Sequence, residues 1–289
     1  MKQTKKILIL GAAGMSGSAL IRYFSSDVNF TVYGSVKTSN LVRQLEARAP
    51  NAQIISSINV ENQDCLTRLF DSVKPDFVVN CVGIVKQLPQ SNDPLAVLPI
   101  NSLLPHRLAR LCEIVGARLV HLSSDCVFSG KKGSYLESGV PDATDLYGRS
   151  KLLGEVDYPH AITLRTSLIG HELQGARGLV NWFLTQEGSV RGFTKAIFSG
   201  LPTVEIARVI EEHVLPHPEL HGVYHLSADP ISKYDLLSTV KDVYGKQIEI
   251  IPDDSLAIDR SLDSTRFQEA TGFVSKPWYE LVQAMHDFG

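Results

Sequence analysis

Short apolar runs alternate with amphipathic stretches along the first half of the chain. Five of these runs are almost continuously apolar, which is typical of parallel strands whose sheet is covered by helices on both faces. They lie at residues 6–10, 30–34, 52–56, 76–82 and 117–123. The segments between them have helical spacing, at 41–49, at 65–73 and within 94–116, where one long helix is expected to begin near Asn101. This alternation predicts right-handed βαβ units and an α/β fold, a Rossmann-type doubly wound parallel sheet.

The pattern becomes less regular after residue 165. One further strand is expected at 222–227, and helices are expected at 178–186, 203–214, 233–245 and 276–288. We therefore divide the chain into an NAD(P)-binding Rossmann domain at 1–165 and a smaller C-terminal substrate-binding lobe at 166–289. The strand at 222–227 is expected to return to the main sheet.

Composition narrows the class of protein. The 289 residues are 44% hydrophobic and 20% charged, with a net charge of −3, so no nucleic-acid partner is expected. No run approaches the ~18 apolar residues of a membrane span, and the early run "ILIL" is too short for a signal peptide. We therefore expect a cytoplasmic protein that does not associate with membranes. Free thiols and no metal site are expected because no paired spacing joins the cysteines, which are Cys65, Cys81, Cys112 and Cys126.

A glycine-rich loop follows the first predicted strand and opens a helix. Its sequence, "GAAGMSG", contains three glycines at intervals of three residues. Glycine permits a tight turn there and lets backbone N–H groups approach a pyrophosphate at the helix N-terminus. A turn required only for packing is the alternative, but the strand–loop–helix context favours dinucleotide binding. The predicted cofactor-binding residues of this loop are Gly11, Gly14, Met15, Ser16 and Gly17.

The end of the second predicted strand bears on the choice of cofactor. NAD-binding proteins commonly place a carboxylate there, which accepts a hydrogen bond from the ribose 2′-hydroxyl. This chain has no Asp or Glu between that strand and Asn40, and it has Ser35 and Lys37 instead. Both side chains could accept a 2′-phosphate, although Lys37 could also be a solvated lysine. NADP is therefore favoured, with NAD as the alternative.

Tyr147 and Lys151 lie four residues apart in "DLYGRSKLLGE", which has helical spacing. Residues at this interval share one helix face, and a nearby ammonium group favours the phenolate form of a tyrosine. The pair is thus a candidate proton donor and the cation that tunes it. A solvent-exposed pair without function is the alternative.

Several motifs, taken in order, resemble the extended short-chain dehydrogenase/reductase superfamily. The three-glycine loop, "NCVG" at 80–83, Asn101, "LSSDCVFSG" at 122–130 and "YGRSKLLGE" at 147–155 carry this resemblance. More narrowly, "SSDCVFSG", "LRTSLIG", "FSGLPT" and "RSLDSTRF" are similar to the dTDP-4-dehydrorhamnose reductase branch. The similarity covers essentially the whole chain.

The resemblance implies a role for each residue of the motifs. Tyr147 would protonate a ketone oxygen as the nicotinamide delivers hydride, and Ser124 would hydrogen-bond that oxygen. Lys151 would also hold the hydroxyl groups of the nicotinamide ribose. The turn after the fourth strand would lie beside the cofactor, and its residues are Cys81, Val82 and Gly83.

The chain departs from its relatives at several positions. Related dehydratases have a glutamate where this chain has Cys126, so simple reduction is favoured over loss of water. Reductases of the branch often have aromatic residues at Cys126 and Leu168, so the floor of the pocket is expected to differ. Ser18 and Ala19 stand where some members have a glutamate of an intersubunit metal site, and no metal is expected. The predicted substrate-binding residues are Ser124, Asp125, Cys126, Leu168 and Arg260.

Three basic residues near these motifs allow more than one interpretation. Arg260 and Arg165 are candidates for binding the diphosphate of a nucleotide, because arginine forms bidentate contacts with phosphate. A structural salt bridge is the alternative for both. Lys86 could reach a substrate, but we interpret it as a solvated surface lysine.

The function expected from the resemblance is NADPH-dependent reduction of the keto group of a nucleotide-activated 4-keto-6-deoxy-sugar, for surface polysaccharide synthesis. One alternative is a nucleotide-sugar epimerase with tightly bound NAD. Another is a non-catalytic regulatory subunit that binds NADP and a partner enzyme. The sugar, the nucleotide and the stereochemistry of the product stay open, and so does the oligomeric state, for which a homodimer is one alternative.

Overall fold

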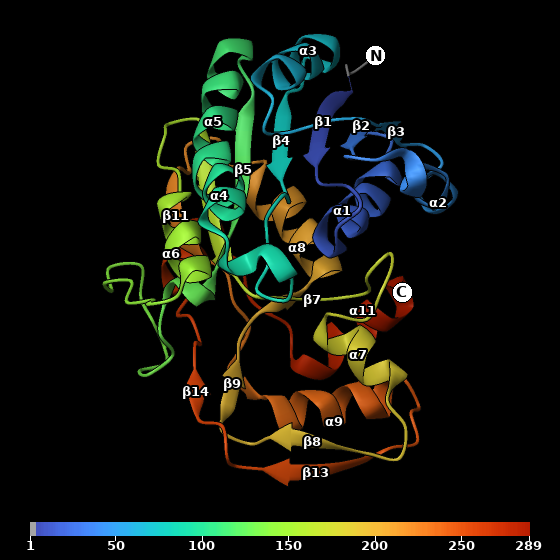
Figure 1. Ribbon diagram of the computed structural model, residues 1–289, viewed down its shortest axis with the longest axis vertical. Coiled ribbons are helices and arrows are strands. Elements are labelled where there is room, and N and C mark those ends of the chain that lie inside the picture. Colours follow the sequence, from blue (N-terminus) through green and yellow to red (C-terminus); the bar gives the residue numbers. More distant parts are fainter. Residues whose placement is uncertain (1–3) are drawn as a thin grey trace.

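A seven-stranded parallel sheet is the centre of the larger lobe in the computed structural model, which describes residues 4–289 (Figure 1). The strand order is β11-β6-β5-β4-β1-β2-β3, and every neighbouring pair is parallel. The strands are β1 (Lys5–Leu10), β2 (Phe30–Ser35), β3 (Gln53–Ile55), β4 (Phe77–Asn80), β5 (Arg118–Ser124), β6 (Ala161–Thr166) and β11 (Gly222–His225). The α/β fold with a doubly wound parallel sheet is thus confirmed.

The two faces of the sheet pack against different helices. In β1, Ile7 and Ile9 belong to one apolar cluster, while Leu8 and Leu10 belong to another. The first cluster includes residues of α1 (Met15–Ser25), α2 (Val42–Arg48), α8 (Thr203–Val209) and α10 (Thr265–Thr271). The second includes residues of α3 (Gln63–Val73) and α5 (Leu104–Val115). Burial on both faces explains why the strands have no polar alternation.

The long helix predicted within 94–116 begins earlier than expected. Its first turn is α4 (Pro94–Val97), which is followed by the π-helical segment η3 (Leu98–Leu103) and then by α5. Asp93 sets the start, because its side-chain oxygen accepts a hydrogen bond from the Leu95 amide at 2.9 Å and Pro94 occupies the first helical position. Asn101 therefore lies inside η3, a kind of segment that is frequent at functional sites.

The second half of the chain divides between the two lobes. The smaller lobe contains paired strands β8 (Ser189–Phe193) and β13 (Glu249–Asp253), with α9 (Lys233–Val243) packed on them (Figure 1). Its apolar cluster also takes residues from α7 (Leu179–Thr185) and α11 (Trp278–Phe288). By contrast, α8, α10 and β11 belong to the larger lobe, so the predicted strand at 222–227 lies in the main sheet as β11.

Short elements complete the architecture, and the sequence pattern did not predict most of them. The short strands are β7 (Leu168–Ile169), β9 (Ala196–Phe198), β10 (Leu201–Pro202), β12 (Ile231–Ser232) and β14 (Ile258–Asp259). The remaining helices are η1 (Ser39–Leu41), η2 (Pro89–Asn92), η4 (Asp125–Val127), α6 (Leu146–Leu153) and η5 (Ile210–Val214). Two residues are too few to show the alternation that is typical of a strand. The pairing of such a short strand depends on tertiary contacts.

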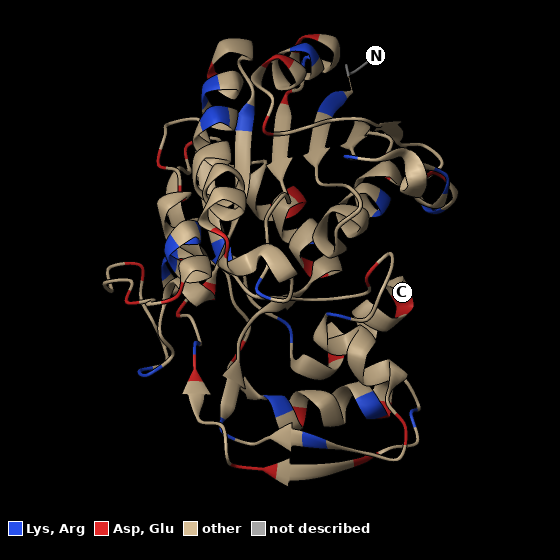
Figure 2. Ribbon diagram, viewed as in Figure 1, with Lys and Arg blue, Asp and Glu red and all other residues tan. Residues whose placement is uncertain are grey.

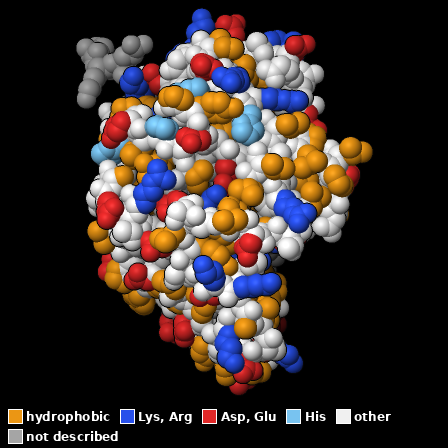
Figure 3. Space-filling model, turned by 90° about the vertical axis from the view of Figure 1, so that its left-hand side faces the viewer, with side chains coloured by type: hydrophobic (Ala, Val, Ile, Leu, Met, Phe, Trp, Pro, Cys, Tyr) orange, Lys and Arg blue, Asp and Glu red, His pale blue; other side chains and the backbone are white. Residues whose placement is uncertain are grey.

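Positions of basic and acidic residues are spread along the ribbon of both lobes (Figure 2). The face seen in Figure 3 likewise mixes basic, acidic and apolar side chains and has no large area of a single sign. Such a surface does not favour nucleic-acid binding. Across residues 4–289, no helix combines the length and the apolar character that crossing a bilayer requires.

Candidate active site

The sheet reverses its winding direction between β1 and β4, and the glycine-rich loop lies at this point. From β1 the chain proceeds outward through β2 and β3, and from β4 it proceeds through β5 and β6 on the other side. In open α/β sheets, ligands bind in the crevice at the carboxyl ends of the strands at such a switch point. The loop leads from the end of β1 into α1, whose N-cap is Gly14.

The structure explains the presence of glycine differently at each of the three positions of the loop. Gly11 has a φ of +80°, a conformation that favours glycine. At Gly17 an added Cβ would collide with the carbonyl oxygen of Gly11, so α1 could not approach β1 as closely. Gly14 has an extended φ of −75°, and an added Cβ there would meet only the Gly11 oxygen, at 3.4 Å. Internal packing therefore does not require glycine at position 14, which fits close approach by a bound ligand.

The turn after β4 lies against this loop. A Cβ on Gly11 would lie 3.1 Å from atoms of Cys81 and Val82. Asn80, at the end of β4, fixes the turn because its side-chain oxygen accepts a hydrogen bond from the Val82 amide at 3.1 Å. The structure thus brings together the glycine loop and two residues predicted to line the cofactor site. Gly83 follows them, with the Asn101 side chain beside it.

Buried Asn101 connects the turn after β4 to the helix that carries Tyr147. Its side-chain amide accepts from the Ile84 amide at 2.8 Å and donates to the Ile84 carbonyl at 2.9 Å. It also donates to the Ser150 hydroxyl at 3.2 Å. These contacts, which depend on residues far apart in the sequence, position the loop beside α6.

The helix α6 carries Tyr147 and Lys151 and packs closely on η4. Asp145 caps its N-terminus, since one carboxylate oxygen accepts a hydrogen bond from the Gly148 amide at 2.8 Å. An aspartate directly before the helical segment, readable in "DLYG", is the sequence signal for this cap. Gly148 lies against η4, and an added Cβ would collide with the Cys126 carbonyl oxygen. This close packing places Tyr147 beside Ser124 and Cys126.

Burial, and not the neighbouring lysine, dominates the environment of Tyr147. It raises the pKa of the phenol well above its usual value, and the nearby Cys126, Asp125 and Asp145 raise it further. The neighbouring Ser124 hydroxyl acts in the opposite direction. Lys151 is not among the main causes of this shift, and its effect on the phenol stays a prediction. A phenol that stays protonated at neutral pH is suited to donating a proton.

Lys151 is almost completely buried, with 5% of its surface exposed. Its ammonium group donates a hydrogen bond to the Leu122 carbonyl at 2.7 Å. Burial lowers the pKa of Lys151 to about 8, although Glu155 and Cys81 act to raise it. The surface-pair alternative therefore does not apply to Lys151.

The predicted substrate-binding residues differ in their contacts in the structure. Ser124 donates to a side-chain oxygen of Asp125 at 3.1 Å and accepts from the Cys126 amide at 3.1 Å. Burial raises the pKa of Asp125, while the charges of Arg260 and Lys86 lower it. Arg260 Nε donates to the Phe128 carbonyl at 2.9 Å. Leu168 lies in β7 and packs against the core of the larger lobe. Its contact with a substrate stays a prediction.

Arg165 does not face the site as a phosphate ligand. It is 5% exposed and forms a bidentate pair with Glu155, at 2.7 and 2.6 Å. Glu155 also accepts a hydrogen bond from Ser123 at 2.8 Å. Arg165 therefore forms a salt bridge within the larger lobe, and not one that anchors the smaller lobe, because a buried guanidinium needs such a partner.

The two residues expected to select the cofactor differ in exposure. Ser35 is buried at the end of β2, whereas Lys37 is exposed in the following loop. No acidic residue lies between β2 and η1. A role for Lys37 in contacting a 2′-phosphate stays a prediction.

All four cysteines are free thiols in the structure. We expect thiol titration of the denatured protein, without reductant, to count four groups. Burial raises the pKa of the thiols of Cys81, Cys112 and Cys126, so these three should react slowly before denaturation. A count below four, or zinc in elemental analysis of the purified protein, would contradict this prediction.

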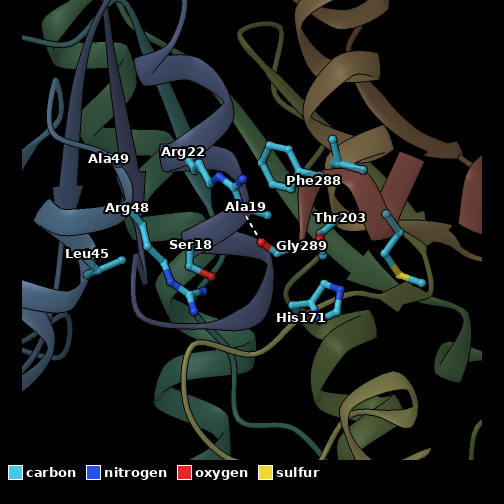
Figure 4. Close-up of a pocket in the computed structure, with 12 residues that line it drawn as sticks. Ser18, Ala19, Arg22, Leu45, Arg48, Ala49, His171, Thr203, Phe288 and Gly289 are labelled. Atoms are coloured by element: carbon cyan, nitrogen blue, oxygen red, sulfur yellow. Dashed lines mark hydrogen bonds between the residues drawn. The ribbon is translucent and has the colours of Figure 1, made fainter. Parts of the chain in front are cut away.

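A separate small cavity of about 30 Å³ lies beside α1 (Figure 4). Ser18 and Ala19 line it together with Arg22, Arg48 and His171. Arg22 donates to the Gly289 carbonyl at 2.9 Å and stacks on Phe288. Basic side chains disfavour a metal cation, and residues 4–289 contain no group of three or more metal-ligating side chains placed to hold one. The absence of a bound metal stays a prediction.

The parallel sheet, the glycine loop at its switch point and the Ser124–Tyr147–Lys151 group define a dinucleotide-binding protein of the short-chain dehydrogenase/reductase type. Residues 5–287 match the family described as the RmlD substrate binding domain, and the chain belongs to this family.

The chain is similar to known proteins of two kinds. The methionine adenosyltransferase 2 subunit beta of Danio rerio is 25% identical over 83% of this chain and 74% of its own length. The dTDP-4-dehydrorhamnose reductase of Aggregatibacter actinomycetemcomitans is 23% identical over 96% of this chain and 97% of its own.

Solved structures have the same fold. The dTDP-4-dehydrorhamnose reductase of Bacillus anthracis in complex with NADP has a TM-score of 0.78 at 19% identity, covering 98% of this chain and 99% of that chain. The Bordetella bronchiseptica enzyme WbmG in complex with NAD and UDP has a TM-score of 0.80 at 19% identity, covering 99% and 94%.

Proposed function

We propose that this protein is an NADPH-dependent reductase of a nucleotide-activated 4-keto-6-deoxy-sugar, acting in the cytoplasm on precursors of surface polysaccharide. The observation that carries the proposal is the group formed by buried Ser124 and Lys151 and half-buried Tyr147. Its support from known proteins is the reductase relative that aligns over 97% of its own length. In this proposal residues 1–165 bind the cofactor and residues 166–289 contribute the substrate side.

The cofactor would lie along the glycine loop and the turn after β4. The residues that would hold it are Gly11, Gly14, Met15, Ser16, Gly17, Cys81, Val82, Gly83 and Lys151, with Ser35 and Lys37 at the adenosine ribose. When bound, NADPH supplies the hydride for the reduction. The space over Gly14, which packing leaves open, fits a pyrophosphate close to the backbone.

Side chains of the protein would hydrogen-bond the ketone oxygen and transfer a proton to it. The Ser124 hydroxyl would hydrogen-bond the ketone oxygen, and Tyr147 would transfer its phenolic proton to that oxygen as negative charge develops there. Lys151, 5% exposed and held by the Leu122 carbonyl, would then stabilise the resulting phenolate. Asp125, Cys126, Leu168 and Arg260 would contact the nucleotide sugar. No carboxylate occupies position 126, so a second acid–base step at the sugar is not favoured.

The experiment is to follow NADPH oxidation by the purified protein against a panel of 4-keto nucleotide sugars. The proposal expects stoichiometric NADPH consumption with at least one sugar. Stoichiometric NAD in the purified protein, with conversion but no net NADPH consumption, would instead support the epimerase alternative. Tight NADP binding without turnover of any sugar would support the regulatory-subunit alternative.

Cofactor choice has its own prediction. We expect NADPH to bind more tightly than NADH, because no carboxylate follows β2 and Lys37 can pair with the 2′-phosphate. Lys37→Ala should weaken NADPH binding and leave NADH binding unchanged, as measured by calorimetry. Lys5→Ala is the control for loss of one lysine, because Lys5 lies at the amino end of β1, away from the predicted cofactor site. Equal affinities for both cofactors, unaltered in Lys37→Ala, would contradict the prediction.

A further inference from the structure

Lys86 is exposed, as the sequence predicts, and it also has a specific partner. It lies on the loop after β4, and its ammonium group is 2.9 Å from a carboxylate oxygen of Asp145. The same ammonium group lies 5.5 Å from the centre of the Tyr147 ring. The side chains of Lys86 and Asp145 are 36% and 46% exposed, so the ion pair lies at the surface.

Both carboxylate oxygens of Asp145 are engaged. One accepts from the Gly148 amide at 2.8 Å and caps α6, while the other accepts from Lys86 at 2.9 Å. The carboxylate therefore joins two segments that are 59 residues apart, the loop after β4 and the first turn of α6. Tyr147 is the second residue of that helix.

Both apolar and polar contacts position α6, and Leu152 packs against the apolar cluster of Val127, Phe128, Tyr135 and Leu262. The helix has eight residues, of which the buried ones are Gly148, Ser150 and Lys151. These side chains are small or polar and offer little area for hydrophobic stabilisation. Polar contacts add to this packing, by Asn101 and Ser102 bonded to Ser150 on one side and by Lys86 at the N-terminal cap.

We propose that Lys86 is a positioning residue for Tyr147, acting through its ion pair with the capping carboxylate of Asp145. The pair holds the first turn of α6 against the loop after β4 and keeps the phenol directed at Ser124. This inference rests on the proposed function for its kinetic consequence, whereas its structural consequence can be measured without a substrate.

The test compares four variants with the wild type. Lys86→Met removes the charge and keeps the length of the side chain, and Lys86→Arg restores a cation. Asp145→Asn keeps an oxygen that can cap the helix but loses the ionic partner. The fourth variant combines Lys86→Met with Asp145→Asn. Lys5→Met is the matched control, since Lys5 pairs with Asp76 at 3.1 Å on a partly exposed surface.

The first measurement is amide hydrogen exchange in the segment 145–153 of the cofactor-free protein. We expect exchange to be roughly two- to fivefold faster in Lys86→Met, the range for loss of a partly exposed ion pair. Lys86→Arg and the control should exchange like the wild type. Unchanged exchange in Lys86→Met would overturn the inference, and this outcome does not depend on which sugar is reduced.

The second measurement is steady-state reduction of the best sugar. We expect kcat to fall roughly tenfold in Lys86→Met with KM little changed, because a misdirected group slows the chemical step. Lys86→Arg should recover most of the rate. The double variant should be no slower than the slower single variant, because the two residues act through one pair.

Other kinetic outcomes would reject the positioning role. A raised KM for the sugar with unchanged kcat in Lys86→Met, equal in size with and without the Asp145→Asn substitution, would assign Lys86 to direct substrate contact. Kinetics equal to the wild type would show that Lys86 does not position Tyr147. If the wild type reduced no sugar, the proposed function would fail, and the exchange measurement alone would decide the inference.

Discussion

Replacing Tyr147 with phenylalanine is expected to lower kcat by roughly 10²–10⁴, the usual contribution of a general acid. The substitution keeps the ring in its place and removes only the hydroxyl. The fold and the cofactor affinity should therefore survive. The measurements are kcat for sugar reduction, NADPH affinity by calorimetry, and thermal unfolding.

Tyr279→Phe is the matched control, because this tyrosine is 60% exposed on α11. It loses the same hydroxyl in a place where exposed substitutions usually change stability by less than about 0.5 kcal/mol. Activity above half of the wild-type value in Tyr147→Phe would remove the proposed mechanism. Because burial keeps the phenol protonated, a loss of activity in this variant points to a missing proton donor.

Replacing Lys151 with methionine is expected to damage both turnover and cofactor binding. The ammonium group has two proposed tasks, to hold the nicotinamide ribose and to stabilise the phenolate of Tyr147. We expect kcat to fall by roughly 10²-fold or more, and NADPH affinity to fall as well. The two variants should therefore share the loss of rate and differ in cofactor affinity. Methionine fills a similar apolar volume, so the buried site should stay packed, which thermal unfolding can verify.

The pKa of Lys151 gives this prediction a pH dependence. Burial lowers that pKa to about 8, so the side chain of the cofactor-free protein is charged below this pH and neutral above it. Binding of the anionic cofactor favours the charged form. NADPH affinity should consequently fall as the pH rises through about 8, and Lys151→Met should abolish this part of the dependence. An affinity that stays flat across that pH range in the wild type would argue against the assigned role.

Much of the fold was predictable because its signals are local. The near-continuous apolar runs of β1, β2, β4 and β5 predicted a doubly covered parallel sheet, and the structure contains it. The start of the helix near Asn101 was wrong, since an upstream cap at Asp93 overrides the helical pattern that begins later. The short strands β7 and β10 escaped prediction because two residues carry no period.

The candidate site was predictable in part for a related reason. The backbone has a positive φ at Gly11 and has no room for a Cβ at Gly17. Both constraints favour glycine, so the sequence itself indicates these two positions. The four-residue interval between Tyr147 and Lys151 is likewise a local property of a helix. By contrast, the salt bridge of Arg165 with Glu155 and the pairing of Lys86 with Asp145 were not predictable from spacing.

The sequence by itself determined the succession of the main strands and helices along the chain. It also determined the position of the glycine loop and the placing of Tyr147 and Lys151 on one helix. Only the tertiary structure decided the protonation of those groups and the partners of the charged residues around them. The physical reason is that backbone preferences depend on near neighbours, whereas a pKa depends on burial and on charges brought in from distant segments. Lys151 and Lys86 illustrate the difference, since both are lysines beside a tyrosine. One is buried with its pKa lowered to about 8, and the other is held near the surface by a carboxylate 59 residues away.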